Sequence, residues 1–217
     1  YNSSHLYSQK LEQRINFLNV IIDKLNNKLL KKIRDKGIKV NNHFLPSLNT
    51  TINKIQKKLK EIEKQRPLLF GHGDLCFNNI LVEPISGSIK LIDPKADFIV
   101  NKKFAYVDPF YDLAKLNHSF GCFYDSIVNN MFSISFNKDD YELRIFKPFN
   151  YEVANFYFQK IFLEKLIDKE LLRILTSNLF LSMIPLHKDD EQKMGALLII
   201  GISLFYDIDM ANYILEK

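Results

Sequence analysis

Apolar side chains recur every three or four positions over the first part of the chain, which is the spacing of one face of a helix. Residues 7–36 carry such a stripe and Gly37 follows it, which predicts one long amphipathic helix ending there. After a connector over residues 40–46, residues 47–65 repeat the pattern with a lysine-rich outer face and predict a second helix. The first stripe suits packing inside a helical lobe, and it would also suit a coiled-coil homodimer through this N-terminal helix.

The pattern changes to short apolar runs between residues 67 and 93. Residues 80–82 predict a buried strand, residues 86–88 a tight turn and residues 89–92 the returning strand of a hairpin. Such a hairpin would bring Asn79, at its entry, close to Asp93, at its exit. The polar residues of this segment are therefore expected to converge.

After residue 107 the pattern again predicts helices, with one further hairpin between them. Asp108-Pro109 predicts the start of a helix, and residues 132–136 and 141–146 alternate about a polar turn, which predicts a second hairpin. Helices are expected near residues 150–166, 168–183 and 189–216. The longest apolar run, residues 194–206, is too short to span a bilayer and indicates a buried helix. These patterns together predict an α+β protein that is mainly α.

Composition adds limits on partners and compartment. The 217 residues are 47% hydrophobic, which is ample for a packed core, and carry a net charge of +5. The lysines alternate with apolar positions at helical spacing and no aromatic residues interleave them, so we expect solvated helix faces and neither a nucleic-acid nor a membrane partner. Two cysteines without metal spacing or a disulfide framework, and a polar start without a signal peptide, favour the cytoplasm.

The candidate chemistry lies in residues 70–93, FGHGDLCFNNILVEPISGSIKLID. Asp74 follows His72-Gly73, Asn79 comes five residues later, and Asp93 ends the second apolar run. Phosphoryl transfer needs a carboxylate to orient the attacking hydroxyl, and an amide and a second carboxylate to hold magnesium. Each residue also has an ordinary structural interpretation: a turn or helix cap for Asp74, a strand entry for Asn79 and a turn before Pro94 for Asp93.

The motif HGDLCFNNIL followed by LID resembles the catalytic loop and metal-binding Asp of the aminoglycoside phosphotransferase and choline kinase group, which shares the protein-kinase fold. Together with LIDPKA and DPFYDLAKLNHS, it looks similar to kinase-like phosphotransferases associated with bacterial surface-polysaccharide synthesis. The resemblance is dense over residues 70–124 and thin elsewhere.

This resemblance implies roles for named residues. Asp74 would be the catalytic base, and Asn79 and Asp93 would bind the Mg²⁺ of a bound ATP or GTP. His72 would hold the loop in place, and Asp112 at a helix start would brace it from below. Lys95 follows Asp93-Pro94, where it would contact phosphates or an anionic substrate, or simply be a solvated loop lysine.

The resemblance also implies a division of the chain. It would be a single C-terminal lobe, with N-terminal helices over residues 1–66, the catalytic segment over 67–125, and a hairpin with further helices over 126–217. Residues 96–107 would correspond to the activation segment. No glycine-rich loop appears among the seven glycines, so the N-terminal nucleotide-binding lobe is expected to be absent from this chain.

The expected function is transfer of the γ-phosphoryl group of a nucleoside triphosphate to a hydroxyl of a sugar, amino alcohol or aminoglycoside. The resemblance favours a role in surface-polysaccharide synthesis. The alternative is a non-catalytic, kinase-like binding or scaffolding lobe. Two histidines outside the motif have open roles: His118 is expected to pack or cap within a helix, and His187 either contributes to acceptor binding or marks a corner between helices.

Overall fold

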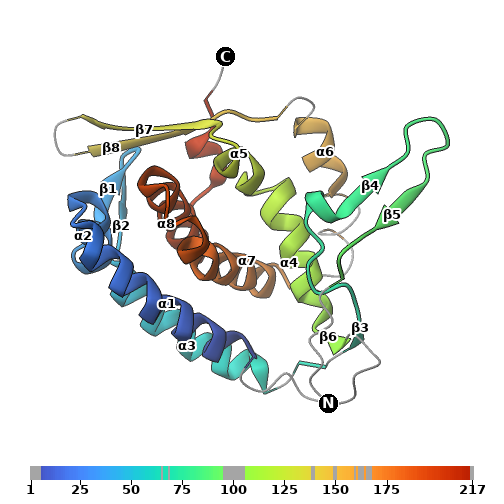
Figure 1. Cartoon of the computed structure of the whole chain (residues 1–217), viewed down its shortest axis with the longest axis horizontal. Helices are drawn as coiled ribbons and strands as arrows, with labels where there is room; N and C mark the ends of the chain where they lie inside the picture. The colour runs from blue at the N-terminus through green and yellow to red at the C-terminus, as the bar shows by residue number, and fades with distance from the viewer. Residues whose placement is uncertain are drawn as a thin grey trace.

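The computed structural model describes residues 6–64, 66–67, 69–94, 106–137, 140–148, 151–158, 160, 164 and 168–215, and the structure below is that of these residues. The chain is α+β and mainly helical, as predicted (Figure 1). Its helices are α1 (Leu6–Leu25), α2 (Lys28–Asp35), α3 (Leu48–Glu63), α4 (Pro109–Phe120), α5 (Tyr124–Val128), α6 (Tyr151–Phe158), α7 (Lys169–Met183) and α8 (Glu191–Phe205).

Its strands are short and belong to separate small sheets. They are β1 (Ile38–Val40), β2 (His43–Leu45), β3 (Leu69–Phe70), β4 (Ile80–Val82), β5 (Ile89–Leu91), β6 (Tyr106–Val107), β7 (Phe132–Asn137) and β8 (Asp140–Ile145). Tight 3-10 turns occur at η1 (Phe77–Asn79), η3 (Ile184–His187) and η4 (Met210–Tyr213).

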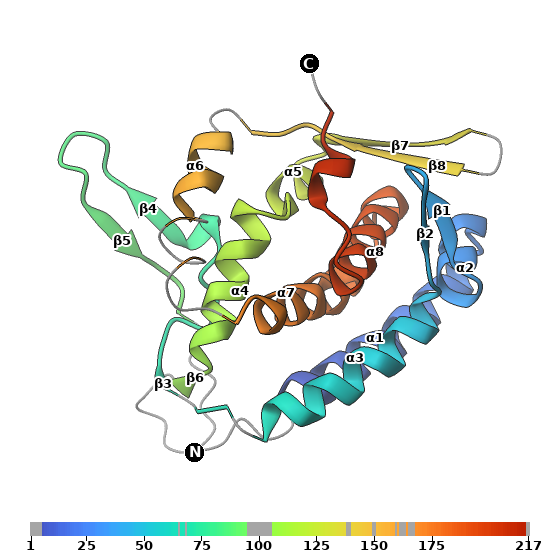
Figure 2. The same cartoon turned by 180° about the vertical axis from the view of Figure 1, so that it is seen from behind.

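Helix α8 lies in the centre of the molecule, with helices on several sides of it (Figures 1 and 2). It contacts α7, α2, α3, α5 and η3, and every residue from Met194 to Phe205 is buried. A helix that is apolar around its whole circumference is stable only when other elements cover it on all sides. Packing against α7 is close at Gly201, where a Cβ atom would lie 2.8 Å from Leu181 Cδ2.

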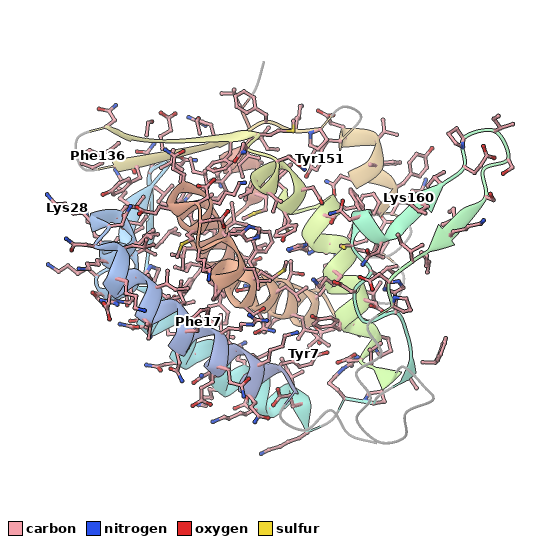
Figure 3. All side chains as sticks on the ribbon, in the orientation of Figure 1. Tyr7, Phe17, Lys28, Phe136, Tyr151 and Lys160 are labelled. Carbon is pink, nitrogen blue, oxygen red and sulfur yellow. The ribbon has the colours of Figure 1, made fainter. Side chains whose placement is uncertain are left out.

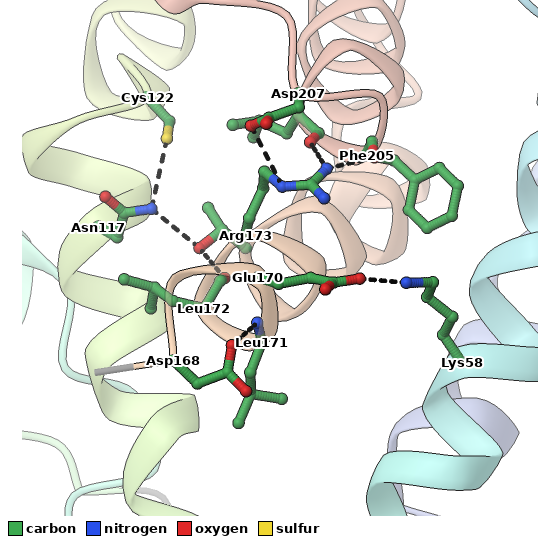
Figure 4. A network of polar contacts seen from close by, with 12 residues as sticks. Lys58, Asn117, Cys122, Asp168, Glu170, Leu171, Leu172, Arg173, Phe205 and Asp207 are labelled. Carbon is green, nitrogen blue, oxygen red and sulfur yellow. Dashed lines mark hydrogen bonds and ion pairs between the residues drawn. The ribbon is translucent and has the colours of Figure 1, made fainter. Parts of the chain in front are cut away.

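The end of α8 corrects one sequence prediction. The helix expected over residues 189–216 stops at Phe205, because the Arg173 guanidinium donates hydrogen bonds to the carbonyls of Leu204 and Phe205 (Figure 4). These are carbonyl groups of the last turn, which have no partner inside the helix. Asp207 then adopts a left-handed backbone conformation, with φ of 59°, and the chain turns away.

The N-terminal helix is also different from the prediction, because it is divided in two. Asn26 takes a φ of 54°, and the Asn27 side chain caps α2 by accepting a hydrogen bond from Leu30 N at 3.0 Å. The apolar stripe of α1 is buried inside the chain, where α1 runs beside α3 and contacts α7 (Figure 1). The stripe therefore packs within the lobe and is not left for a partner helix.

A four-stranded sheet, ordered β2-β1-β8-β7, covers one end of the helices. The hairpin β7–β8 was predicted, whereas β1–β2 lies in the expected connector and turns through Asn41 and Asn42, both with positive φ. The Asn41 amide accepts from Leu143 N and donates to the carbonyls of Leu143 and Asn212. One side chain thus ties the first hairpin to β8 and to η4.

The hairpin β4–β5 extends from the helical body at the other side of the molecule (Figures 1 and 2). Its register pairs Ile80 with Leu91 and Val82 with Ile89, as the sequence predicts for two short strands around a turn. The expectation that residues 80–82 are buried is wrong: Leu81 is 49% exposed and Val82 60% exposed. Figure 3 shows that this hairpin projects beyond the packed side chains of the helical body.

No helix in the described part of the chain combines the length and apolar character that crossing a membrane requires.

Candidate active site

The start of α4 is the platform on which the candidate site is built. Asp108 caps the helix by accepting from Phe110 N at 2.9 Å, and Pro109 stands in its first turn, where it is well tolerated. The buried Asp108 carboxylate also forms a two-pronged ion pair with Arg66, at 2.8 and 2.9 Å. Arg66 precedes the loop of the candidate site in the sequence and holds both oxygens of the Asp108 carboxylate. The first turn of α4 is therefore fixed relative to the chain that leads into this loop.

Asp112, one turn along α4, binds the backbone of the loop that carries His72 and Asp74. Its carboxylate accepts hydrogen bonds from His72 N at 2.7 Å and Gly73 N at 2.8 Å. The approach is so close that a Cβ atom on Gly71 would lie 2.8 Å from Asp112 Oδ2, so glycine is required there. Burial outweighs these hydrogen bonds and raises the pKa of Asp112. The structure thus contains the contact that was expected beneath this loop.

The His72 ring joins the loop to the end of β5. Its Nδ1 accepts a hydrogen bond from Asp74 N at 3.3 Å, so the ring proton belongs on Nε2, which lies 2.9 Å from the carbonyl oxygen of Ile92. Ile92 immediately precedes Asp93. His72 therefore links the backbone of one candidate residue to the backbone beside another, which is the holding role expected for it.

Asn79 makes the second link between the same segments. Its side-chain nitrogen donates to the carbonyl oxygen of Asp74 at 2.8 Å, and its own carbonyl accepts from Ile92 N at 3.0 Å. Because the amide nitrogen is engaged with the loop, the side-chain oxygen is the atom left for a cation. Asp93 follows at the exit of β5 with a φ of 54°, an uncommon conformation for a residue other than glycine that is often found at functional sites.

Three of the expected site residues are thus brought together by backbone contacts. Asp74, Asn79 and Asp93 stand on adjoining stretches of chain, although the sequence separates the first from the last by the whole hairpin. Lys95 and most of the segment 96–107 lie outside the described residues.

Lys115 is a site residue that the sequence analysis missed. Its Nζ lies 2.9 Å from Asp74 Oδ1, and the two side chains are only 5% and 15% exposed. The signal was present in the motif YDLAKL, because residues three apart share a helix face and Lys115 is three residues after Asp112. The motif had drawn attention to the carboxylate alone.

An aromatic and imidazole cluster continues from Lys115 into the body. Tyr124 Oη lies 3.2 Å from His187 Nε2, and the Tyr124 ring stacks on His118 at 3.7 Å between centroids. His118 is completely buried and neither ring nitrogen has a hydrogen-bond partner among the described residues. Burial, with the neighbouring charge of Lys115, lowers its pKa well below the usual value, so its ring stays neutral.

A cavity of about 520 Å³ lies beyond α4, among α4, α6, α7 and the segment after α8. Figure 4 shows that two of its polar lining residues are engaged within the fold: Arg173 binds the end of α8, and Asn117 donates to Thr176 at 3.0 Å. These two groups serve the packing of the helices, unlike the polar groups that surround Asp74.

Within the described residues, no three His, Cys, Asp or Glu side chains are grouped so that they would hold a metal ion. The pair Asn79 and Asp93 is a smaller set, of the kind that binds Mg²⁺ together with phosphate oxygens and water. Comparison of the chain with protein-family models, curated proteins and solved structures finds no match.

Proposed function

We propose that this chain is the catalytic lobe of a Mg²⁺-dependent phosphotransferase that moves the γ-phosphoryl group of a nucleoside triphosphate to a hydroxyl of a small molecule. The observation that carries the proposal is the convergence of Asp74, Asn79 and Asp93, held by Asp112 and His72. A solvated turn would not need two backbone hydrogen bonds to a half-buried carboxylate beneath it. The resemblance of the motifs further favours a sugar acceptor in surface-polysaccharide synthesis.

In this proposal each residue has a limited task. Asp74 orients the acceptor hydroxyl and accepts its proton, while Lys115 holds the Asp74 carboxylate in place through their 2.9 Å ion pair. The side-chain oxygen of Asn79 and the Asp93 carboxylate would hold Mg²⁺, which when bound neutralises phosphate charge. His72 and Asp112 keep these groups at fixed relative positions, and positioning is the main contribution that a protein makes to this reaction.

Groups that cover the nucleotide would come from elsewhere. We propose a separate β-rich lobe, in the same protein or a partner, seated on the apolar face of the hairpin β4–β5. Ile80, Val82, Ile89 and Leu91 share this face by their register, and Val82 and Ile89 are 60% and 65% exposed. A two-stranded hairpin is marginal alone and gains stability when another layer covers it.

The test uses this chain together with the proposed nucleotide-covering lobe, as the native protein supplies it, with Mg²⁺ and ATP or GTP. Asp74→Asn is expected to retain Mg-nucleotide binding and to lower phosphoryl transfer by about 10²- to 10⁴-fold, the usual contribution of a general base. Asp93→Ala is expected to remove the Mg²⁺-dependent part of nucleotide affinity. Asp23→Asn, on the outer side of α1, serves as the control and should change neither quantity.

Full transfer by Asp74→Asn would overturn the role of this residue, and unchanged Mg²⁺-dependent affinity in Asp93→Ala would overturn the metal site. The second candidate is a non-catalytic kinase-like lobe, and the ion pair that engages Asp74 with Lys115 favours it. Binding of Mg-nucleotide by the native protein without transfer to any alcohol would establish that candidate instead.

A further inference from the structure

A row of side chains on α4 leads from the loop backbone to the cluster around Tyr124. Asp112, Lys115 and His118 recur at intervals of three residues, so each is a neighbour of the next on the helix surface and the row winds gradually around α4. The first binds the loop backbone, the second binds the Asp74 carboxylate and the third stacks on Tyr124. Tyr124 is therefore positioned from the same helix that positions the proposed base.

The Tyr124 phenol is held from three sides. His118 covers one ring face at 3.7 Å, Phe180 packs edge-on at 6.0 Å, and His187 from η3 meets the hydroxyl at 3.2 Å. Lys115 Nζ lies 3.7 Å from Sδ of Met183, the last residue of α7, so η3 begins beside the proposed base. The phenol and imidazole thus form a fixed polar pair near Asp74.

The groups around this polar pair keep both of its side chains uncharged. Burial raises the pKa of Tyr124, and the nearby charges of Asp125, Cys76 and Asp74 raise it further. Burial and Lys193 lower the pKa of His187, against the opposing effect of Asp189 and Asp190. Near neutral pH both side chains are therefore neutral. Their mutual hydrogen bond uses one donor and one acceptor, and the pair keeps one further donor and one further acceptor for a ligand.

We propose that Tyr124 and His187 bind hydroxyl groups of a neutral, sugar-like acceptor beside Asp74, and that Lys115 disfavours acceptors carrying an ammonium group. This inference rests on the proposed phosphotransferase function and names the substrate class of the same site. A neutral polyhydroxylated ring matches a pair of neutral hydrogen-bonding groups, because each hydroxyl both donates and accepts.

A cationic acceptor matches the site poorly for two reasons. The ammonium group of Lys115 already occupies Asp74 Oδ1, so a second ammonium group would meet a like charge at short range. An open aromatic face can also bind an ammonium group, and His118 covers one face of Tyr124. Asp125 near Tyr124, and Asp189 and Asp190 near His187, are the carboxylates that would have to offset this repulsion.

The experiment measures equilibrium binding to the full chain without nucleotide, by NMR titration at about pH 6.5, where amines are protonated. The probes are three matched pairs: glucose, galactose and mannose, each with its 2-amino-2-deoxy counterpart. For at least one pair, the neutral sugar is expected to bind at least about tenfold more tightly than the amino sugar, the effect of a modest charge penalty.

Variants identify the residues responsible. Tyr124→Phe and His187→Ala are expected to weaken binding of the neutral sugar by about 5- to 20-fold, the value of one or two hydrogen bonds. Lys115→Met is expected to bring the two members of a pair to similar affinity, because the repulsive charge is gone. Tyr206→Phe and His43→Ala are the matched controls and should bind as the unaltered chain does.

Three results would overturn the inference: no binding of any neutral sugar, tighter binding of the amino sugars, or an unchanged ratio in Lys115→Met. These outcomes are separate from failure of the proposed function, because no nucleotide is present. A chain that binds neutral sugars but transfers no phosphoryl group would retain this site and lose the reaction. Transfer to an amino alcohol alone would retain the reaction and overturn this acceptor class.

Discussion

Helix α8 and the hairpin β4–β5 are both apolar in sequence, yet they hold their positions in different ways. Every residue from Met194 to Phe205 is buried among other elements, whereas Leu81, Val82, Ile89 and Leu91 are about half exposed or more. The hairpin is fixed at its base instead, through His72, Asn79 and Asp112. Apolar packing determines the position of α8, and directed hydrogen bonds determine the position of the hairpin.

The difference shows how functional side chains can be held at defined positions on a segment that buries few apolar residues. Packing tolerates replacement by another apolar side chain of similar volume, whereas a hydrogen bond requires a donor and acceptor at defined positions. The loop holding Asp74 is fixed by the second kind of contact. We therefore expect the two regions to respond oppositely to apolar and polar substitutions.

The largest effect is expected from a matched pair of leucine substitutions. Leu197→Ala in α8 should lower the free energy of unfolding by about 2–5 kcal/mol, since it leaves a cavity in a fully buried position. Leu81→Ala in β4 should cost less than about 1 kcal/mol, because its side chain is half in solvent already. Chemical denaturation of both variants measures the difference. Equal losses would mean that another element covers the hairpin in solution.

The next effect concerns a polar group below the hairpin. Asp112→Asn should cost about 1–3 kcal/mol, because one of the two backbone N–H groups now bound by the carboxylate loses its acceptor. Hydrogen exchange should speed up at His72 and Gly73 while amides in α8 stay protected. Asp23→Asn is a control with an exposed carboxylate. Unchanged hydrogen exchange at His72 and Gly73 in Asp112→Asn would show that other contacts hold the loop.

The smallest effect is a dependence of stability on pH, which arises from His118 in α4, outside both regions. The pKa of His118 is lowered in the folded protein, so below about pH 6.5 the unfolded chain binds a proton that the folded chain does not. Stability should therefore fall as pH decreases, by up to about 1.4 kcal/mol per pH unit for this group. His118→Phe should reduce the dependence of stability on pH. Phe180→Leu in the same cluster should lower stability at every pH and leave its pH dependence unchanged. An identical slope in His118→Phe would contradict the assignment.

Local patterns predicted much of the fold and failed where the outcome depends on distant contacts. The helices α3 and α7 and the hairpins β4–β5 and β7–β8 follow periodicity in their own residues. The division between α1 and α2 depends on Asn26 and Asn27, and the end of α8 depends on Arg173 from another helix. The exposure of β4 was missed, because an apolar run shows only that a strand suits burial and not that a partner is present.

The candidate site divides in the same way. Asp74, Asn79 and Asp93 were expected to meet because a tight turn and a short hairpin bring neighbouring segments together. Lys115 was hidden in a motif noted for its carboxylate, and the Tyr124–His187 pair joins residues 63 positions apart. No local spacing predicts such a pair, since it depends on how α5 packs against the turn after α7.

The Asn41 side chain has a consequence for the order in which the molecule can assemble. Its partners Leu143 and Asn212 lie 102 and 171 positions further along the chain. At about 5–20 residues per second, a ribosome needs on the order of 10 to 30 s after Asn41 to deliver Asn212. For the first part of that interval, until β8 is made, the β1–β2 hairpin lacks the strand it pairs with, and it lacks its last anchor throughout. The edge that later joins β8 is then the segment of the nascent chain most in need of protection from wrong pairing.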